Sequence, residues 1–513
     1  MTQQHSISIT LNTISNYIGQ GYSIIIAAII TPFYLQYLGA EAFGLVGFFL
    51  VLQNLLNLLD MGLSATLVRQ VAHARGQMKG FEKFQNLLKS FELIFIALSL
   101  VIVIGIFLSK NWLANGWIKS TLLSHNDIAY CINIMGLIIG IRFFSTLYRS
   151  GIIGFEDQIW LNKTSVIINT LKYIGSLLIL VYLSNDIRHF FEYQLVIGAL
   201  EAVFLHRRFY FNLPSPDFAV NWLKVDWGAF REIFPFAVSI AYTSTILIVI
   251  TQFDKLLLSG LLSLEEFGYL SLVTLIAGAV LGLSTPVFMA FLPKMTMLVS
   301  KGNPKEMIDA YVNMTQVVTW ISFSSAVLIG IFPREILYFL TGGEKAFAWG
   351  HEILYWYVLG SGIYVLGTFQ YYLQNAIGTL RLYVIGSTLS FVIMVPLIYI
   401  VTIKYGPIGA GQLWFAFGLI WFLGWTSVVH TKLVPGFHLK WLLKDMLPIL
   451  VFVGVLSCLL RINVHIDVNK SRLIVAAETV TIGIAFLFAT SICVRSFRIK
   501  YMKIVRRNLG SSM

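Results

Sequence analysis

Charged side chains recur at helical spacing inside apolar stretches of the chain. Lys172 lies near the middle of one such stretch with Asn169 three residues before it, and Arg142 and Arg149 lie in the preceding stretch. A charge at membrane depth costs at least about 2.5–3.5 kcal/mol on insertion scales, so it needs a partner or a use. Ammonium and guanidinium groups in a low-dielectric cavity would hold a compact anion. We therefore predict that Lys172, Arg142, Arg149 and Asn169 bind an anionic substrate.

A polar row marks the second apolar stretch, residues 43–67. Gln53, Asn57, Asp60 and Ser64 are spaced i, i+4, i+7 and i+11. On one continuous helix they would fall within an arc of roughly 60°, which should face a wet cavity or a partner rather than lipid. Asp60 and Asn57 therefore join the predicted substrate-binding set. The alternative, of equal weight, is that Asp60 pairs with one of the predicted cations and only stabilises the helices around it.

Other rows strengthen the case for a polar interior. The first apolar stretch carries four polar residues within an arc of roughly 80°: Asn12, Asn16, Gln20 and Ser23. The fifth stretch carries four residues with the same spacing as the row in the second stretch: Ser165, Asn169, Lys172 and Ser176. Arg149 lies near a predicted cytoplasmic end, where it would equally contact lipid phosphate.

A further pair of charges, Asp254 and Lys255, lies near the outer end of the seventh predicted span. Adjacent residues point to different sides of a helix. We predict that these two residues act in gating or coupling, and substrate contact is an alternative of equal weight.

Tyrosines dominate the polar row of the tenth predicted span, residues 350–376. Tyr357, Tyr364 and Tyr371 recur at i, i+7 and i+14 through its depth, whereas an aromatic belt occupies only the ends of a span. Aromatic faces with phenolic hydroxyls suit sugar rings, so we predict that these tyrosines bind substrate. Ordinary helix packing with hydroxyl pairs is the alternative.

Composition places the chain in a membrane. Of its 513 residues 57% are apolar and 12% charged, and the mean hydropathy is +0.79. Apolar runs of about 20 residues, the length that spans a bilayer, predict an all-α integral membrane protein with about fourteen transmembrane helices. No signal peptide is expected. We predict an N-terminal lobe of spans 1–6 at residues 1–206 and a cytoplasmic linker at 207–232. A C-terminal lobe of spans 7–12 follows at 233–430, and residues 431–513 hold spans 13–14 and a basic cytoplasmic tail.

Most of the 36 Lys and Arg residues fall on one side of the predicted membrane. The positive-inside rule therefore predicts cytoplasmic N- and C-termini. Basic loops beside anionic lipid also account for the net charge of +12 without any nucleic-acid partner.

An internal repeat links the two predicted lobes. Phe43-Gly44 and Phe267-Gly268 are 224 residues apart, and Gly154 and Gly378 share that offset. A third match, Gly62-Leu-Ser64 with Gly282-Leu-Ser284, needs a four-residue shift. This pattern predicts two lobes of the same orientation, related by an axis along the membrane normal.

Motifs for soluble catalysis are absent from the sequence. We find no GxxxxGK[ST], HExxH or GxSxG pattern, and Cys131, Cys458 and Cys493 lie far apart in apolar spans. We therefore expect no enzyme activity, no metal and no cofactor.

Three runs carry a resemblance to a known family. The run LGAEAFGLVGFFLVLQNLLNLLDMGLSATLVRQ resembles the start of O-antigen and polysaccharide flippases of the Wzx type. These belong to the multidrug/oligosaccharidyl-lipid/polysaccharide (MOP) exporter superfamily. The run FDKLLLSGLLSLEEFGYLSL is similar to the start of the family's second lobe, and YYLQNAIGTLRL to its tenth span.

The resemblance implies a V-shaped, two-lobed transporter in the bacterial inner membrane. It would move an undecaprenyl-diphosphate-linked oligosaccharide from the cytoplasmic to the outer leaflet by alternating access. Its partners would be this lipid-linked oligosaccharide, membrane lipid, and the polysaccharide polymerase and chain-length machinery, and we expect a monomer. Coupling to a proton or sodium gradient is left open.

Two other functions compete with this one. An ion-coupled small-molecule or drug antiporter of the same superfamily is disfavoured by the fourteen predicted spans and by a cationic lobe, which would repel cationic drugs. A membrane-embedded polysaccharide polymerase or glycosyltransferase would need a large catalytic loop. The longest outer loop, 110–127, holds only Asp127, Lys110 and Lys119 as charged residues.

Overall fold

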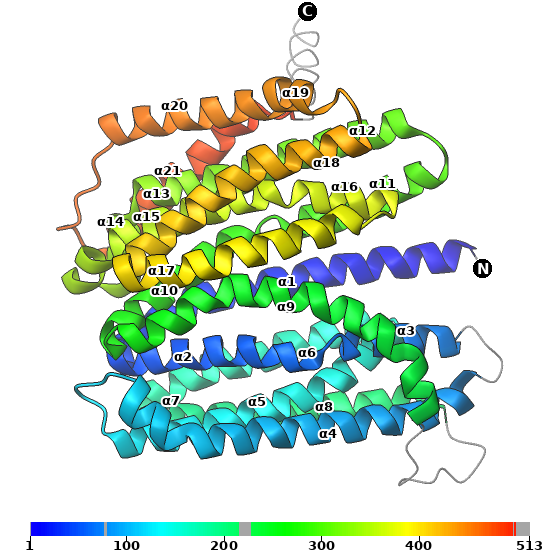
Figure 1. Ribbon diagram of the computed structural model, residues 1–513. Coiled ribbons are helices and arrows are strands. Elements are labelled where there is room, and N and C mark those ends of the chain that lie inside the picture. Colours follow the sequence, from blue (N-terminus) through cyan, green and yellow to red (C-terminus); the bar gives the residue numbers. More distant parts are fainter. Residues whose placement is uncertain (1, 76–79, 215–226, 496, 499–513) are drawn as a thin grey trace, which may run out of the picture. The chain divides into compact units, whose positions relative to one another are not determined.

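The computed structural model describes residues 2–75, 80–214, 227–495 and 497–498, and these are helical almost throughout (Figure 1). The contacts divide the chain into two compact units, Met1–Gly268 and Tyr269–Met513. Residues 215–226 of the predicted linker and most of the basic tail lie outside the described residues, and the predicted lobe boundaries stay predictions. The all-α fold is confirmed.

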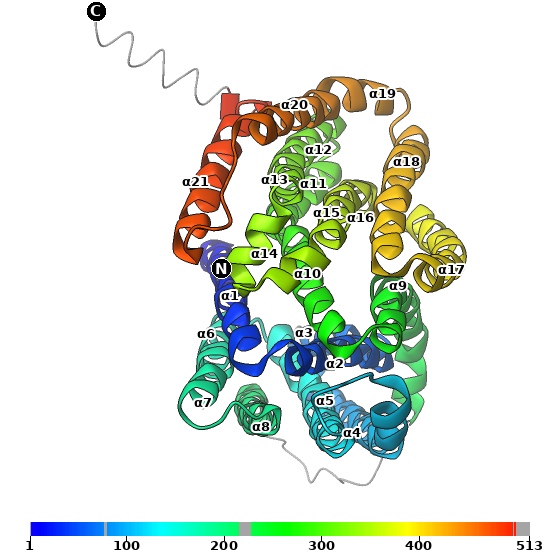
Figure 2. The same cartoon turned by 90° about the vertical axis from the view of Figure 1, so that its left-hand side faces the viewer.

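The first unit is built on one central helix, α5 (His125–Gly154), which packs along α4 (Gly80–Trp112) and α8 (Ile187–Asn212) (Figures 1 and 2). Its buried residues recur at helical spacing, among them Ile132, Met135, Ile139 and Leu147, each at most 2% exposed. The other elements are α1 (Thr2–Leu38), α2 (Ala40–Leu56), the turn η1 (Asn57–Asp60), α3 (Leu63–Arg75), η2 (Leu113–Trp117), α6 (Gln158–Thr170), η3 (Leu171–Gly175), α7 (Ser176–Tyr182), α9 (Trp227–Leu261) and the start of α10 (Leu264–Gly282).

The second predicted span is a broken helix. After α2 ends at Leu56, the chain makes a 3-10 turn, and Met61 and Gly62 adopt φ angles of 45° and 70°. The Asp60 carboxylate then accepts hydrogen bonds from the Ser64 N–H at 3.2 Å and from its hydroxyl at 2.5 Å. A short acidic side chain satisfies helix-start N–H groups, and glycine tolerates positive φ. The prediction of one continuous helix over 43–67 is therefore wrong.

The predicted repeat has a counterpart in the helix pattern and in a reciprocal contact. α10 ends at Gly282 and α11 begins at Thr285, so both Gly-Leu-Ser runs lie at a helix break. A Cβ on Gly44 would collide with the Leu264 carbonyl, and a Cβ on Gly268 with the Ala40 carbonyl. These four residues form two pairs at the 224-residue offset, and only glycine permits this backbone approach.

The second unit continues from α10 through a series of long and short helices. These are α11 (Thr285–Ser300), α12 (Pro304–Val318), η4 (Thr319–Phe323), α13 (Ser324–Ile331), α14 (Pro333–Thr341), α15 (Glu344–Gly367), α16 (Phe369–Ile377), α17 (Arg381–Ile420), η5 (Trp421–Trp425), α18 (Thr426–Leu433), α19 (His438–Trp441), η6 (Leu442–Met446), α20 (Leu447–Asn463) and α21 (Arg472–Ser491).

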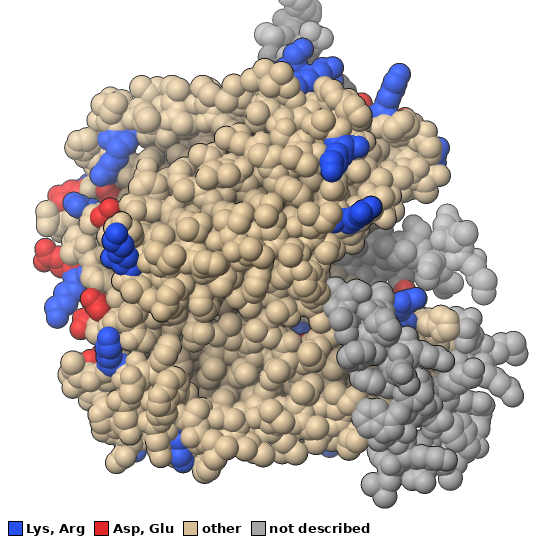
Figure 3. All heavy atoms as spheres, viewed as in Figure 1, with Lys and Arg blue, Asp and Glu red and all other residues tan. Residues whose placement is uncertain are grey.

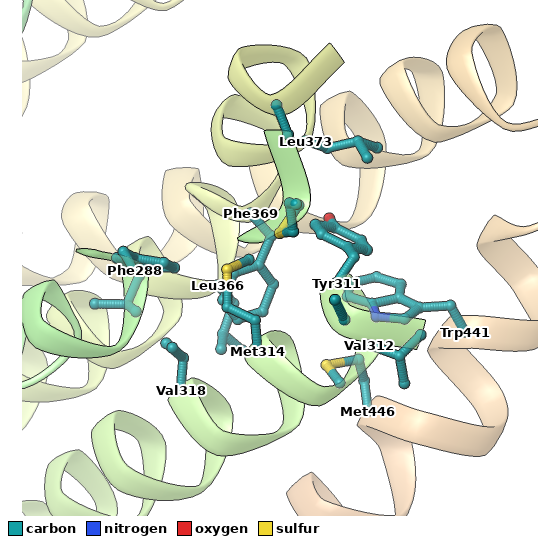
Figure 4. Close-up of a cluster of buried hydrophobic side chains, with 14 of the residues drawn as sticks. Phe288, Tyr311, Val312, Met314, Val318, Leu366, Phe369, Leu373, Trp441 and Met446 are labelled. Atoms are coloured by element: carbon teal, nitrogen blue, oxygen red, sulfur yellow. The ribbon is translucent and has the colours of Figure 1, made fainter. Parts of the chain in front are cut away.

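An aromatic cluster forms the core of the second unit (Figure 4). Trp441 and Phe369 pack edge to face with ring centroids 6.2 Å apart, and both are fully buried. The Trp441 indole N–H donates to the Thr315 hydroxyl at 3.0 Å, and the Tyr311 hydroxyl lies 2.7 Å from His430 Nε2. These two buried contacts fix α19 and α18 against α12.

Eleven segments of the described chain are long and apolar enough to cross a membrane. One of them, Arg381–Leu433, spans 53 residues and contains Gly406 with non-helical angles before Pro407, so it is two helices joined at a kink. Helices α8 and α15 occupy predicted spans without belonging to the eleven, and the count of fourteen stays a prediction. On the face in Figure 3, charged side chains lie mostly toward the ends of the helices and a broad uncharged band separates them.

Candidate functional site

A polar cavity of about 550 Å³ opens inside the first unit, between α1, α5, α6 and α8. More than half of its lining residues are polar, which is unusual for helices that cross lipid and indicates a wet interior. The lining consists of Asn16, Gly19, Gln20, Ser23, Ile24, Arg149, Ile153, Gln158, Leu161, Asn162, Ser165, Ile168, Asn169 and Glu201.

Side-chain amides link α1 to α6 along one wall of this cavity. Asn16 Nδ2 donates to Gln158 Oε1 at 2.6 Å, and Asn162 Nδ2 donates to Asn16 Oδ1 at 2.6 Å. Two turns further along, Asn169 Nδ2 donates to the Ser23 hydroxyl at 2.8 Å. The predicted polar rows of the first and fifth spans thus meet each other; the side chain of Asn12 lies outside the described residues.

The opposite wall carries an ion pair. Arg149 of α5 and Glu201 of α8 approach to 2.5 Å between Nη2 and Oε1, and Arg149 Nη1 also donates to Ser165 Oγ at 3.5 Å. Sequence reasoning missed Glu201, although a lone acid inside the predicted sixth span, 190–206, carries the same signal that singled out Lys172. The carboxylate beside Arg149 is therefore Glu201 rather than Asp60.

Arg142 lies two turns before Arg149 on the same helix. Its Nη1 donates to Gln53 Oε1 of α2 at 2.8 Å, and its guanidinium lies 5.6 Å from the centroid of the Phe49 ring. Coulombic interactions join it to Glu201 and Arg149. Arg142 does not line the cavity itself.

Lys172 is presented by a π-helical turn, η3, that interrupts the fifth predicted span. The turn's carbonyls accept hydrogen bonds from side chains: Tyr34 donates to Tyr173 O at 2.8 Å and Tyr193 to Leu171 O at 3.0 Å. Such turns often lie at functional sites because they re-aim a side chain. The turn is thus fixed by neighbouring helices, and the position of Lys172 is defined.

The Lys172 ammonium makes no hydrogen bond or ion pair with any residue that the structure describes. Its Nζ lies 5.5 Å from the centroid of the Tyr173 ring, and Coulombic interactions join it to Arg142 and Glu201. Arg142, Arg149, Lys172 and Glu201 therefore form one electrostatically linked group, which we call the cationic cluster. Its three cations and one carboxylate leave an excess of positive charge.

No described hydrogen bond or ion pair joins Asp60 or Asn57 to this cluster. Both belong to the turn η1, where Asp60 binds Ser64 at the start of α3 and Asn57 is exposed. Neither residue lines the cavity. Because the helix breaks here, the spacing that placed them on one face does not apply, and their binding role stays a prediction.

Asp254 and Lys255 form a local pair in α9. Lys255 Nζ lies 3.3 Å from Asp254 Oδ1 and donates to the Thr251 carbonyl at 2.6 Å. The expectation that adjacent charges point to different sides is wrong here, since the long lysine side chain turns back along the helix. Their gating or coupling role stays a prediction.

The predicted tyrosines lie in the second unit, against α17. Tyr357 is buried, and Tyr364 stacks on Trp414 with ring centroids 4.8 Å apart. Tyr371 lies beyond the break at Thr368 and packs against Tyr383 with centroids 4.6 Å apart. These are the contacts of helix packing, and substrate binding by the tyrosines stays a prediction.

The all-helical membrane fold and its charged internal cavity define a transporter of the multi-pass membrane class. The chain belongs to the family described as polysaccharide biosynthesis protein, whose family model matches residues 9–299. This confirms the resemblance to the polysaccharide flippases of the MOP superfamily. The cavity and the cationic cluster lie wholly within the matched residues.

Relatives agree with this assignment. A Shigella flexneri protein named "Putative O-antigen transporter" is 20% identical over 414 residues, which cover 79% of this chain and 94% of the relative. The lipid II flippase MurJ in an inward closed conformation superposes with a TM-score of 0.69 at 16% identity, covering 97% of this chain and 100% of MurJ. An inward-facing multidrug transporter of the MATE family gives 0.66 at 12% identity, covering 80% and 96%. These relatives are transporters rather than enzymes, as predicted.

Proposed function

We propose that this protein is a flippase for an undecaprenyl-diphosphate-linked oligosaccharide, which it moves from the cytoplasmic to the outer leaflet of the bacterial inner membrane. Support comes from family membership and from the cationic cluster. The observation that carries the proposal is Lys172, a cation at membrane depth whose ammonium has no hydrogen-bond or ion-pair partner among the described residues. A diphosphate would supply the missing counter-charge.

The cluster offers the donor types that a diphosphate requires. Guanidinium groups of Arg142 and Arg149 present several N–H donors in a planar fork, and Lys172 adds a compact charge. Arg142 is oriented by Gln53 and Arg149 by Glu201 and Ser165. A bound diphosphate would displace part of these contacts and join the three cations through its own oxygens.

The wet cavity lowers the barrier that makes unassisted flipping slow. Sugar hydroxyls and phosphate charges lose their hydration in lipid, at a cost of several kcal/mol for each unpaired group. Polar lining residues replace that hydration while the lipid tail stays in the bilayer. This is why amides and charges, rather than an apolar pore, suit the proposed substrate.

Direction follows from the topology that the loops predict. With both termini cytoplasmic, alternating access would open the cavity first to the cytoplasmic leaflet, where lipid-linked units are made, and then to the outer leaflet. Coupling to a proton or sodium gradient, action as a monomer and contact with polymerase and chain-length machinery belong to this proposal.

Depletion of the protein in its own host tests the function. Inside-out and right-side-out vesicles are labelled with membrane-impermeant periodate, and the labelled lipid-linked glycan is quantified. Depletion should raise the label in inside-out vesicles and lower it in right-side-out vesicles, and a Lys172→Ala copy should fail to restore the balance. An unchanged leaflet distribution after depletion would contradict the proposal.

A further inference from the structure

Five primary amides face the cavity from the α1–α6 wall: Asn16, Gln20, Gln158, Asn162 and Asn169. We call this set the amide wall. It lies in the same unit as the cationic cluster, and no prediction from the sequence assigned sugar binding to it. A row of neutral amides is not needed to bind a diphosphate, so its presence calls for a separate account.

The amide wall has more hydrogen-bonding capacity than its internal contacts use. Each primary amide has two N–H donors and one carbonyl acceptor. Asn16 and Asn169 each use one donor on the α1–α6 links described above, and Asn162 Nδ2 donates both to Asn16 Oδ1 and to the Ser15 hydroxyl at 3.1 Å. Within the described part of the chain, Gln158 Nε2 and Asn169 Oδ1 have no partner, and Gln20 makes no side-chain hydrogen bond at all.

Surplus amides are costly in a bilayer unless something polar fills the space beside them. An unsatisfied amide in an apolar setting costs roughly 1–3 kcal/mol by protein mutational data, so helices that only needed to pack would have paired these groups or lacked them. In a wet cavity, water would satisfy them. A ligand with both donors and acceptors could replace that water without loss.

The chemistry of the wall selects a neutral polyhydroxyl ligand. Sugar hydroxyls and acetamido groups both donate and accept, as the amides do. A cationic ligand would find one carboxylate in the lining, Glu201, and that carboxylate is already paired with Arg149. An anionic ligand would be held by the cluster rather than by the amides.

Arg149 connects the cationic cluster to the amide wall, since it lines the cavity, whereas Arg142 and Lys172 do not. It belongs to the cationic cluster, and its Nη1 donates to Ser165, which lies on α6 between Asn162 and Asn169. A diphosphate on Arg149 would therefore place the group bonded to it beside the amide wall. We propose that the amide wall is a carbohydrate subsite that binds the sugar directly attached to the diphosphate, an inference that rests on the proposed function.

Two lipid probes test this subsite with the purified full-length protein in nanodiscs. The probes are undecaprenyl diphosphate and undecaprenyl-diphosphate-linked N-acetylglucosamine. Wild-type protein should bind the glycosylated probe more tightly. Gln20→Met keeps the length of the side chain, removes its hydrogen bonds and breaks no described contact, so the fold is retained. It should weaken binding of the glycosylated probe about three- to tenfold and leave binding of the sugar-free probe unchanged.

Matched variants separate the subsite from the rest of the site. Gln36→Met changes the same residue type on the same helix outside the cavity and should alter neither affinity. Lys172→Ala should weaken both probes. The carbohydrate subsite would be overturned if the wild type bound the two probes with equal affinity. It would also be overturned if Gln20→Met changed neither affinity or changed both equally. Either result would leave the proposed flippase function standing. Failure of the wild type to bind either probe would overturn the proposed function as well.

Discussion

Arg149 and Glu201 come from different helices, α5 and α8, and form an ion pair with 2.5 Å between Nη2 and Oε1 on the cavity wall. Both side chains remain partly exposed, at 37% and 20%. Under the proposed function, a substrate phosphate would take the place beside Arg149 that this carboxylate occupies. Glu201 would then act as an internal counter-ion that the substrate displaces.

Glu201→Gln should tighten binding of undecaprenyl diphosphate and slow its release, because Arg149 would lose its competing carboxylate. A partly exposed pair contributes about 1 kcal/mol, so we expect about a fivefold lower Kd with a lower transport rate. Equilibrium binding and transport measured on the same preparation check this. Glu192→Gln, which changes a carboxylate bonded to Tyr130 outside the cavity, is the control. An unchanged Kd in Glu201→Gln would refute the counter-ion role.

Lys172→Ala should reduce transport about tenfold or more while the protein still inserts, because a hydrogen bond to a charged group contributes about 1.5–3 kcal/mol. Lys172→Arg should restore more activity than Lys172→Gln, since charge rather than polarity is required. Export of the glycan in cells, with membrane abundance as reference, is the measurement. Lys163→Ala removes an exposed lysine of α6 and should be silent. Full export by Lys172→Ala would remove this residue from phosphate binding.

Asp60→Ala should lower thermal stability, because it removes the acceptor for the Ser64 N–H and hydroxyl at the start of α3. Loss of such a cap costs about 0.5–2 kcal/mol. Asp60→Asn keeps an acceptor and should retain most of the stability and the transport. The melting temperature in detergent and the transport rate are compared. Normal stability with lost transport in both variants would instead assign Asp60 to the substrate.

Single cysteines report the predicted topology. Asn115→Cys in η2 and Lys301→Cys after α11 lie at exposed positions, in a background with Cys458 and Cys493 replaced by serine and the fully buried Cys131 retained. A membrane-impermeant maleimide applied to intact spheroplasts should label Asn115→Cys only, and lysis should expose Lys301→Cys. Labelling of both before lysis would show that the predicted orientation or span count is wrong.

The sequence anticipated those features that depend on local pattern and failed on those that depend on packing. Apolar runs of bilayer length became helices because lipid leaves the backbone no other partners. The row from Gln53 to Ser64 failed because an angular count presumes an unbroken helix, whereas Met61 and Gly62 reverse φ. The sequence did contain one sign of this break, because Asp60 is followed two residues later by Gly62.

The spacing of residues along the sequence does not show which side chains on different helices contact each other. Glu201 lies 52 residues from Arg149, and nothing local indicates that α5 and α8 pack side by side. The spacing of the tyrosines placed them on one face of a helix, but only the packed structure shows that Tyr364 stacks on Trp414. Lys172 and Asn169 were singled out by their spacing and by their depth in an apolar stretch. The structure places Asn169 on the cavity wall and Lys172 in the cationic cluster without lining the cavity.

Reconstitution tests the central claim most directly. Purified protein is placed in liposomes that carry a fluorescent undecaprenyl-diphosphate-linked oligosaccharide, and a membrane-impermeant reductant quenches the fluorophore exposed in the outer leaflet. Wild-type protein should make the protected fraction accessible over time, and the variant carrying Arg149→Ala and Lys172→Ala should leave it protected, as protein-free liposomes do. Equal rates for wild type and this double variant, or no flipping by either, would contradict the account.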